Sequence, residues 1–436
     1  MSDDSTKNKL GIWMSTSLVV GNMVGSGVFL LPASLAFYGG ISIFGWIFSS
    51  LGAFFLAIVF STLSREIPKA GGPYAYARVG YGDFVGFLVV WTYWISIWCG
   101  NAAITVALIS YLSVFIPILS ESNLFAILSG LGIIWLLTFV NALGIRKGGS
   151  LQLLTTVLKI IPLLLIPIGG LLFFNWDNFL PLNISTESDF SAITSTATLT
   201  LWAFLGLESA TIPSGSTKNP EKTIPRATKI GTIVAALIYI VSTMSVMGIV
   251  SPEILQTSNA PFADAAKVIW GETGNLLVAG AAVISTFGAL NGWILIQGQI
   301  THATASDNLF PKVFLKVSKN GTPVLGLVIT SVLVSILILL NFSRGLVETF
   351  SFIILLSTLS VLLAYIFSSG TYLIRTDLAG NKKKALTRLI LGSLAFTYSF
   401  WAIAGAGTEV VYWGFLLAIA GVPFYIYFKL KNNILQ

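Results

Sequence analysis

The sequence predicts an all-helical protein that crosses a membrane twelve times, with its first and sixth membrane segments interrupted. Composition supports this class, because 55% of the 436 residues are hydrophobic and only 9% are charged, whereas globular chains carry about 25% charged residues. Segment length supports it too, because each apolar stretch has the roughly 20 residues that a helix needs to cross a bilayer. These lengths exclude the short alternating strands of a membrane β-barrel.

Twelve apolar segments follow one another along the chain. They lie near residues 12–37, 42–63, 83–115, 123–144, 152–175, 190–213, 228–250, 275–300, 323–342, 346–374, 387–406 and 410–430. We number the loops alternately, starting from a cytoplasmic N-terminus. With this numbering, 21 of the 24 basic residues fall on the cytoplasmic side, and the exceptions are Lys159, Lys267 and Arg344. This asymmetry follows the positive-inside rule, so both termini are expected to be cytoplasmic.

Several classes of function are excluded by missing residue types. Cys99 is the only cysteine, so the chain cannot form an internal disulfide. His302 is the only histidine and lies in a predicted cytoplasmic loop, which excludes a multi-histidine metal site and a Ser-His-Asp catalytic triad. The GxxxxGK[ST] pattern of an ATP-binding loop is absent. The net charge of +7 comes from the topology-determining loops, which argues against a nucleic-acid partner. We therefore expect no enzyme activity, no cofactor and no metal.

The chain is organised around residues 21–27, GNMVGSG, in the first apolar segment. Three glycines, an asparagine and a serine stand between apolar flanks, so the helix is expected to break there. A broken helix in hydrocarbon leaves backbone polar groups that must line a cavity or hold a ligand. The alternative is that these small residues let one helix pack closely against another.

The sixth segment, TLTLWAFLGLESATIPSGS, carries a second interruption. Gly206, Ser209 and Pro213 make it a poor continuous span, and Glu208 is the one acidic residue predicted deep in the membrane. A charge there costs about 2.5–3.5 kcal/mol on insertion scales, which favours a functional role.

Matching interruptions in two halves are typical of inverted-repeat transporters with a midplane site. The predicted organisation is a cytoplasmic tail at 1–11, a ten-helix core at 12–374 and two peripheral helices with the cytoplasmic C-terminus at 375–436. Within the core, the two repeats are expected near 12–175 and 190–374.

Other polar residues lie inside apolar segments. In the third segment, one helix face is shared roughly by Tyr93, Ser96, Ile97, Gly100 and Asn101. On this face Asn101 either contacts a ligand or joins two helices. Lys159 lies twelve residues beyond Lys147, about 18 Å along a helix. It either faces the protein interior or reaches back to the head groups.

Motifs along nearly the whole chain resemble a known family. GNMVGSGVFLLPASLA, PKAGGPYAYAR, WAFLGLESA and STKNPEKTIPRA are similar to the amino acid–polyamine–organocation superfamily, and within it to the basic amino acid/polyamine antiporters. The arginine/agmatine antiporters are the most similar branch. The resemblance implies a LeuT-type 5+5 inverted repeat with discontinuous helices 1 and 6, followed by two further helices. It also implies a homodimer in the bacterial inner membrane.

The resemblance also implies which residues form the site for an amino acid or amine substrate. The expected substrate-binding residues are Met23, Ser26, Gly27, Ser96, Ile97, Asn101, Trp202, Leu205, Trp293 and Ser357. The expected gating or coupling residues are Tyr93, Glu208, Tyr365 and Lys159. Aromatic faces suit a cation, and helix ends suit the charged groups of an amino acid.

The chain departs from the arginine/agmatine antiporters at three places. Ala203 stands where they have a serine, Ser96–Ile97 replaces their alanine–cysteine pair, and Lys159 resembles a lysine of other superfamily members. A positive charge near the site would disfavour a dicationic substrate or could carry a proton. The predicted function is exchange of a cationic, arginine-like amino acid for a related amine or amino acid. The alternative is a proton-coupled or exchange-type carrier of neutral amino acids that uses Lys159.

Overall fold

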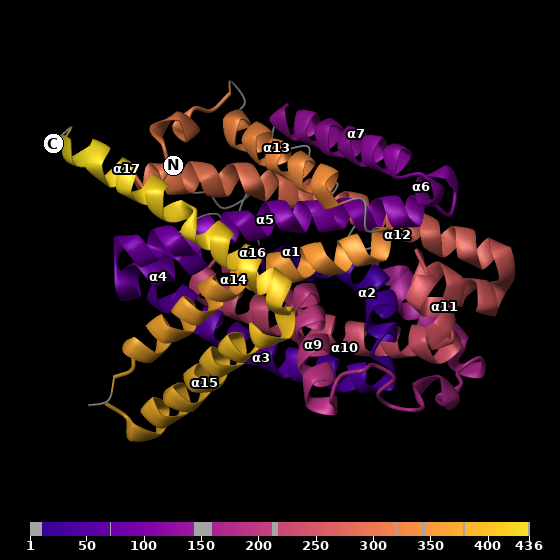
Figure 1. Cartoon of the computed structure of the whole chain (residues 1–436). Coiled ribbons are helices and arrows are strands. Elements are labelled where there is room, and N and C mark those ends of the chain that lie inside the picture. Colours follow the sequence, from indigo (N-terminus) through magenta and orange to yellow (C-terminus); the bar gives the residue numbers. More distant parts are fainter. Residues whose placement is uncertain are drawn as a thin grey trace.

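The computed structural model describes residues 11–69, 71–143, 159–211, 217–318, 321–341, 345–377 and 380–434. In these ranges the regular elements are all helices (Figure 1). Among the described residues, ten helical segments are long and apolar enough to cross a membrane, and shorter apolar helices at Lys159–Leu172 and Val324–Leu340 fall at the predicted fifth and ninth segments. The all-helical, membrane-spanning class is confirmed, while twelve complete crossings stay a prediction.

The first membrane segment is two helices, α1 (Ile12–Met23) and α2 (Ser26–Ala36). Val24 has ψ 86° and Gly25 has φ −129° and ψ −134°, so neither residue continues the helix. Small residues allow this sharp joint in an otherwise apolar segment. The predicted break is confirmed.

The sixth segment is interrupted as well. The helix α9 (Asp189–Leu201) passes into the 3-10 turn η4 (Trp202–Phe204), and a second turn, η5 (Ser209–Thr211), follows. Between the turns, Leu205 is extended and Gly206 has φ +102°, a backbone conformation that glycine adopts at little cost. This confirms the second predicted interruption. Pro213, which the sequence analysis included in it, lies outside the described residues.

Further helices of nine or more residues make up most of the rest of the described fold. They are α3 (Ser42–Glu66), α4 (Pro73–Tyr81), α5 (Asp83–Leu112), α7 (Asn123–Ala142), α10 (Pro220–Ile249), α12 (Pro261–Ser306), α13 (Val324–Asn341), α14 (Leu346–Ile374), α15 (Lys382–Trp401), α16 (Thr408–Ile419) and α17 (Gly421–Ile434). Short helices α6 (Ile118–Glu121) and α11 (Pro252–Thr257) lie between them. The helix α12 begins before the predicted 275–300 segment and bends at Gly271, where φ is +70°.

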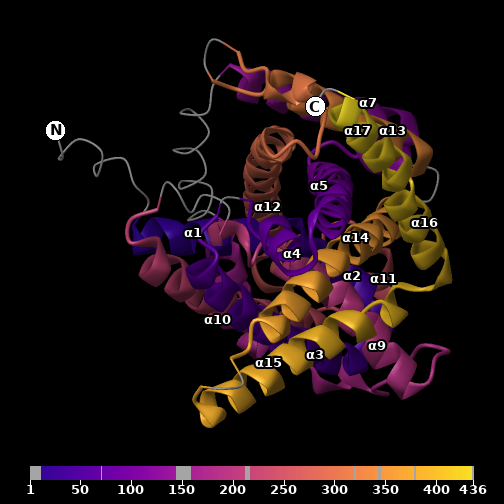
Figure 2. The same cartoon turned by 90° about the vertical axis from the view of Figure 1, so that its left-hand side faces the viewer.

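Burial separates the core helices from the peripheral ones. The helices α1, α2 and α5 are buried over nearly their whole apolar length, whereas α7, α15, α16 and α17 expose large apolar side chains. Seen along the axes of α5 and α12, these peripheral helices lie at the rim of the molecule (Figure 2). Apolar surfaces of this kind suit contact with lipid chains. The division of the core into two repeats stays a prediction.

Candidate substrate site

A cavity lies where the two helix breaks meet. Its lining comes from α1, α2, α5, η4, α12 and α14 and consists of Asn22, Met23, Gly25, Ser26, Gly27, Ser96, Ile97, Gly100, Ile104, Trp202, Leu205, Trp293 and Ser357. Every predicted substrate-binding residue except Asn101 is in this set. The fold thus brings together residues that are more than 300 positions apart in the chain, as from Met23 to Ser357.

The Trp202 indole forms one wall of the cavity and is 8% exposed. Glycines on two other elements leave the space that it occupies. A methyl group on Gly27 would lie 2.9 Å from Cδ1 of Trp202, and one on Gly100 would lie 3.1 Å from its Cη2. Because neither position carries a side chain, the ring fits between the start of α2 and the middle of α5.

Helix ends point at the same space. The first backbone N–H groups of α2, beginning at Ser26, have no partner within the helix, and neither do the last carbonyl groups of α1, which ends at Met23. The partial charges of these ends favour a carboxylate at α2 and an ammonium group at α1. Within the described residues, the Ser26 hydroxyl and the Asn22 amide nitrogen are buried without a hydrogen-bond partner. The sequence analysis missed Asn22, although it lies inside the GNMVGSG motif.

Two serines form a pair at the side of the cavity between α5 and α14. The Ser357 hydroxyl donates to the Ser96 carbonyl oxygen at 2.7 Å, and the two hydroxyl oxygens are 3.2 Å apart. Because the Ser357 proton is used in that bond, its oxygen remains as an acceptor. The pair therefore suits a hydrogen-bond donor such as an ammonium group.

Asn101 lies away from this cavity and joins three helices. Its amide nitrogen donates to Oε1 of Gln297 on α12 at 2.7 Å, and the Gln297 amide nitrogen donates to Ser331 on α13 at 2.9 Å. Asn101 is completely buried. The Asn101 amide nitrogen thus has the helix-joining role that the sequence analysis held as the alternative to ligand contact, while among the described residues its amide oxygen has no hydrogen-bond partner.

Three predicted gating residues meet on one side of the cavity. The Tyr93 hydroxyl donates to Oε1 of Glu208 at 2.9 Å, and the Tyr365 hydroxyl donates to Oε2 at 3.0 Å. All three side chains are buried. They belong to α5, to the segment between η4 and η5, and to α14, so this cluster ties three elements together. In the predicted topology it lies on the cytoplasmic side of the cavity.

Lys159 is completely buried, and its ammonium group donates to the Gly21 carbonyl oxygen at 2.8 Å. This geometry places it in the protein interior, which was one of the two predicted possibilities, and rules out the reach to head groups. It is absent from the cavity lining. A positive charge at this position stabilises the carbonyl end of α1. Lys147, from which its depth was measured, lies outside the described residues.

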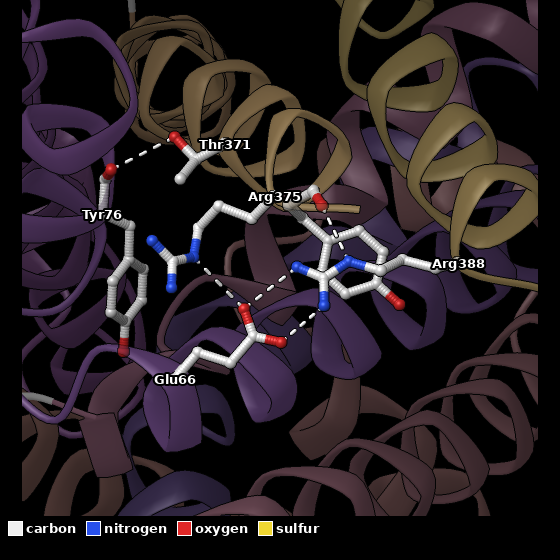
Figure 3. Close-up of polar contacts among 6 residues, drawn as sticks. Glu66, Tyr76, Thr371, Arg375 and Arg388 are labelled. Atoms are coloured by element: carbon white, nitrogen blue, oxygen red, sulfur yellow. Dashed lines mark hydrogen bonds and ion pairs between the residues drawn. The ribbon is translucent and has the colours of Figure 1, made fainter. Parts of the chain in front are cut away.

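An ion cluster joins the C-terminal ends of α3 and α14 to the start of α15 (Figure 3). Glu66 accepts two hydrogen bonds from Arg388, at 2.5 and 3.0 Å, and one from Arg375 at 3.4 Å. The Arg388 guanidinium also lies 4.4 Å from the centre of the Tyr372 ring. The sequence analysis assigned the two arginines to topology only. The bidentate pairing of Arg388 with Glu66 gives the C-terminal end of α3 a fixed neighbour in this conformation.

Two broken helices around a buried cavity define a membrane transporter. The chain belongs to the amino acid permease family, whose model matches residues 10–385. It is 35% identical over 433 residues to the cadaverine/lysine antiporter of Escherichia coli K12, covering 97% of this chain and 95% of that protein. It is 33% identical over 436 residues to the putrescine transporter PotE of Haemophilus influenzae, covering 98% of both chains.

Solved structures with the same fold include manganese transporters. A mutant of the Eremococcus coleocola protein matches with a TM-score of 0.60 and 15% identity over 97% of this chain and 94% of that one. The complex of this manganese transporter with an aromatic bis-isothiourea compound matches with a TM-score of 0.58 and 13% identity. This match covers 100% of this chain and 98% of that one. At this identity the likeness shows the fold alone. Across the described residues, no group of three or more His, Cys, Asp or Glu side chains is arranged to hold a metal ion.

These relatives confirm that the chain belongs to the predicted superfamily and to its basic amino acid/polyamine antiporters, and that it is a transporter rather than an enzyme. It is a multi-pass membrane protein with small-molecule substrates. The closer likeness to arginine/agmatine antiporters stays a prediction.

Proposed function

We propose that the chain is a secondary active antiporter that exchanges a cationic amino acid for a related amine or amino acid by alternating access. The observation that carries this proposal is the cavity between the two helix breaks, with the indoles of Trp202 and Trp293 in its lining. The names of the relatives support it, because one is a cadaverine/lysine antiporter and another a putrescine transporter. Arginine remains a candidate substrate beside lysine.

Each charged group of such a substrate has a partner in the cavity. The α-carboxylate would accept hydrogen bonds from the N–H groups at the start of α2, and the α-ammonium would donate to carbonyls at the end of α1. No charged side chain lines the cavity among the described residues. A distal cation is therefore left with an indole face, which contributes about 0.5–2 kcal/mol, and with the Ser96 and Ser357 oxygens.

Alternating access needs a gate on each side of the cavity whose opening depends on the bound substrate. The Tyr93–Glu208–Tyr365 cluster would close the cytoplasmic side, and it would open when the buried Glu208 carboxylate gains a proton or is approached by a substrate cation. The proposed orientation has both termini in the cytoplasm of a bacterium, with the chain in the inner membrane. A homodimer is proposed on the family resemblance, and the mass of the detergent-purified complex tests it.

Counterflow in proteoliposomes tests the proposal. Vesicles loaded with lysine or arginine are given labelled lysine, arginine, cadaverine, putrescine, agmatine and neutral amino acids, at acidic and at neutral pH. We expect uptake of cationic substrates only into loaded vesicles, with competition by the matching amine. Exchange of neutral amino acids in vesicles that ignore lysine and arginine would contradict the proposal.

The second candidate is a proton-coupled or exchange-type carrier of neutral amino acids, with Lys159 as the coupling residue. One observation favours it: the Lys159 ammonium group is completely buried and bonds to the Gly21 carbonyl, two residues from the cavity residue Met23. A proton leaving this lysine would remove its charge and so weaken its bond to the end of α1. The charge state of Lys159 could in this way be coupled to the broken helix.

Replacing Lys159 by alanine separates the two candidates. The antiporter proposal expects exchange of cationic substrates to continue, while stability falls by about 1–3 kcal/mol because the Gly21 carbonyl loses its buried partner. Proton-dependent uptake and thermal stability are both measured. Lys159→Met is the matched control, because it fills the space without the charge. Loss of proton-driven neutral amino acid uptake in a stable variant would favour the second candidate.

A further inference from the structure

We infer that a second cavity, on the outer side of the core, recruits the ammonium group of the substrate, with the Glu348 carboxylate as its partner. This inference rests on the proposed function. We call this cavity the outer vestibule; its lining includes Ser34, Phe37, Tyr38, Leu199, Gln256, Glu348, Ser351 and Leu355. These residues come from the outer ends of α2 and α14, from α11, from the loop after α2, and from Leu199 near the inner end of α9. In the predicted topology they face away from the cytoplasm.

Three elements lead from the outer vestibule to the substrate cavity. Ser34 lies eight residues after Ser26 on α2, about 12 Å along the helix. Leu199 on α9 precedes Trp202 by three residues, and Ser351 on α14 precedes Ser357 by six. The two cavities share no lining residue. A substrate entering from outside would therefore pass along the walls of both.

A hydrogen bond lies at the boundary of the vestibule. The Ser34 and Ser351 hydroxyl oxygens are 2.8 Å apart and join α2 to α14. Both residues line the vestibule and neither lines the substrate cavity. In this conformation the bond holds together two of the elements between which a substrate would move inward. The vestibule is thus a separate compartment at which a substrate can bind first.

Among the described residues, no basic group pairs with the negative charge at the vestibule; Arg344, four residues before Glu348, lies outside them. Glu348 is exposed, and within the described residues it has no basic partner. A second carboxylate, Glu187, lies close to the rim: burial raises the pKa of the vestibule residue Tyr38, and the charge of Glu187 raises it further. Lys267, a basic residue of the same face, is paired with Glu272 at 2.8 Å. A cleft with one sign of charge raises the local concentration of oppositely charged solutes.

The rest of the lining suits an ammonium group on an aliphatic chain. Phe37, Leu199 and Leu355 provide an apolar wall for methylene groups. The amide nitrogen of Gln256 donates to the Ala36 carbonyl at 3.1 Å, so its amide oxygen remains as an acceptor. The combination selects for lysine-like amino acids and diamines over neutral amino acids.

Uptake kinetics of Glu348→Gln in proteoliposomes test this subsite. With labelled cadaverine or lysine outside at low ionic strength, we expect KM to rise about two- to fivefold, the effect of losing one exposed ion pair, with kcat unchanged. High salt should reduce the difference. Glu121→Gln is the matched control, because Glu121 is an exposed carboxylate on the same face that does not line the vestibule.

A cysteine at the same position separates charge from shape. Cys99, the only native cysteine, is completely buried, so a membrane-impermeant thiol reagent would modify Glu348→Cys selectively and from outside. A sulfonate-bearing reagent should restore the low KM, and a trimethylammonium-bearing reagent should raise KM beyond that of Glu348→Gln. Equal effects of the two reagents would overturn the inference.

The outcomes distinguish this inference from the proposed function. If the wild-type protein exchanges cationic substrates and Glu348→Gln keeps the wild-type KM, the vestibule subsite is overturned and the proposed function is not. An equal rise in KM for a transported neutral amino acid would also overturn the subsite. Wild-type protein that exchanges only neutral amino acids would overturn the proposed function and the subsite with it.

Discussion

Replacing Trp202 by leucine is expected to weaken the binding of a cationic substrate by about tenfold or more, because the cation loses the indole face and its packing. The ring lies between Gly27 and Gly100, where a methyl group on either residue would press against it, at 2.9 Å and 3.1 Å. Leucine cannot fill this space or offer a π-face. Substrate affinity of the purified protein, measured by scintillation proximity or calorimetry, is the readout.

Two further variants make the expectation specific. Trp94 has a similar exposure of 7%, but its indole donates to Thr330 and does not line the cavity, so Trp94→Leu should lower thermal stability without a selective loss of affinity. Gly27→Ala should displace the Trp202 ring and weaken binding without removing it. If Trp202→Leu folds and binds lysine and cadaverine with wild-type affinity, Trp202 is not part of the site.

Replacing Glu208 by glutamine is expected to reduce the exchange rate by about ten- to a hundredfold, with a smaller change in KM. The Glu208 carboxylate accepts both tyrosine hydroxyls in a buried position, and hydrogen bonds to a charged group contribute about 1.5–3 kcal/mol each. A neutral amide weakens this closure, and alternating access requires that the closure form in every cycle. Exchange at saturating substrate on both sides measures the effect.

Single tyrosine variants give the matched comparison. Tyr93→Phe and Tyr365→Phe each remove one of the two hydrogen bonds and leave the carboxylate, so each should cause a smaller loss than Glu208→Gln. Glu208→Gln should also lose any dependence of exchange on pH that belongs to this carboxylate. Exchange by Glu208→Gln at the wild-type rate and pH profile would exclude a coupling role for Glu208.

Asn101 and Asn22 show why the site could be predicted only in part. Both are polar residues in apolar segments, and a helical period places a residue on a face but does not say which neighbour that face meets. The Asn101 amide nitrogen bonds to Gln297 on α12, whereas the Asn22 amide nitrogen has no partner among the described residues and lies beside the cavity. The choice depends on how α5 and α1 are rotated against helices that are distant in the chain.

The sequence by itself determined the membrane-spanning class, the two helix breaks and the acidic residue within the sixth segment. These features depend on local composition: apolar length, runs of small residues and the cost of a buried charge act over a few turns of helix. Only the tertiary structure decided which side chains meet. The Glu208 contacts with Tyr93 and Tyr365 span 115 and 157 positions, and that of Lys159 with Gly21 spans 138. Such contacts follow from how the helices pack and cross, which the order of residues along each single segment does not reveal.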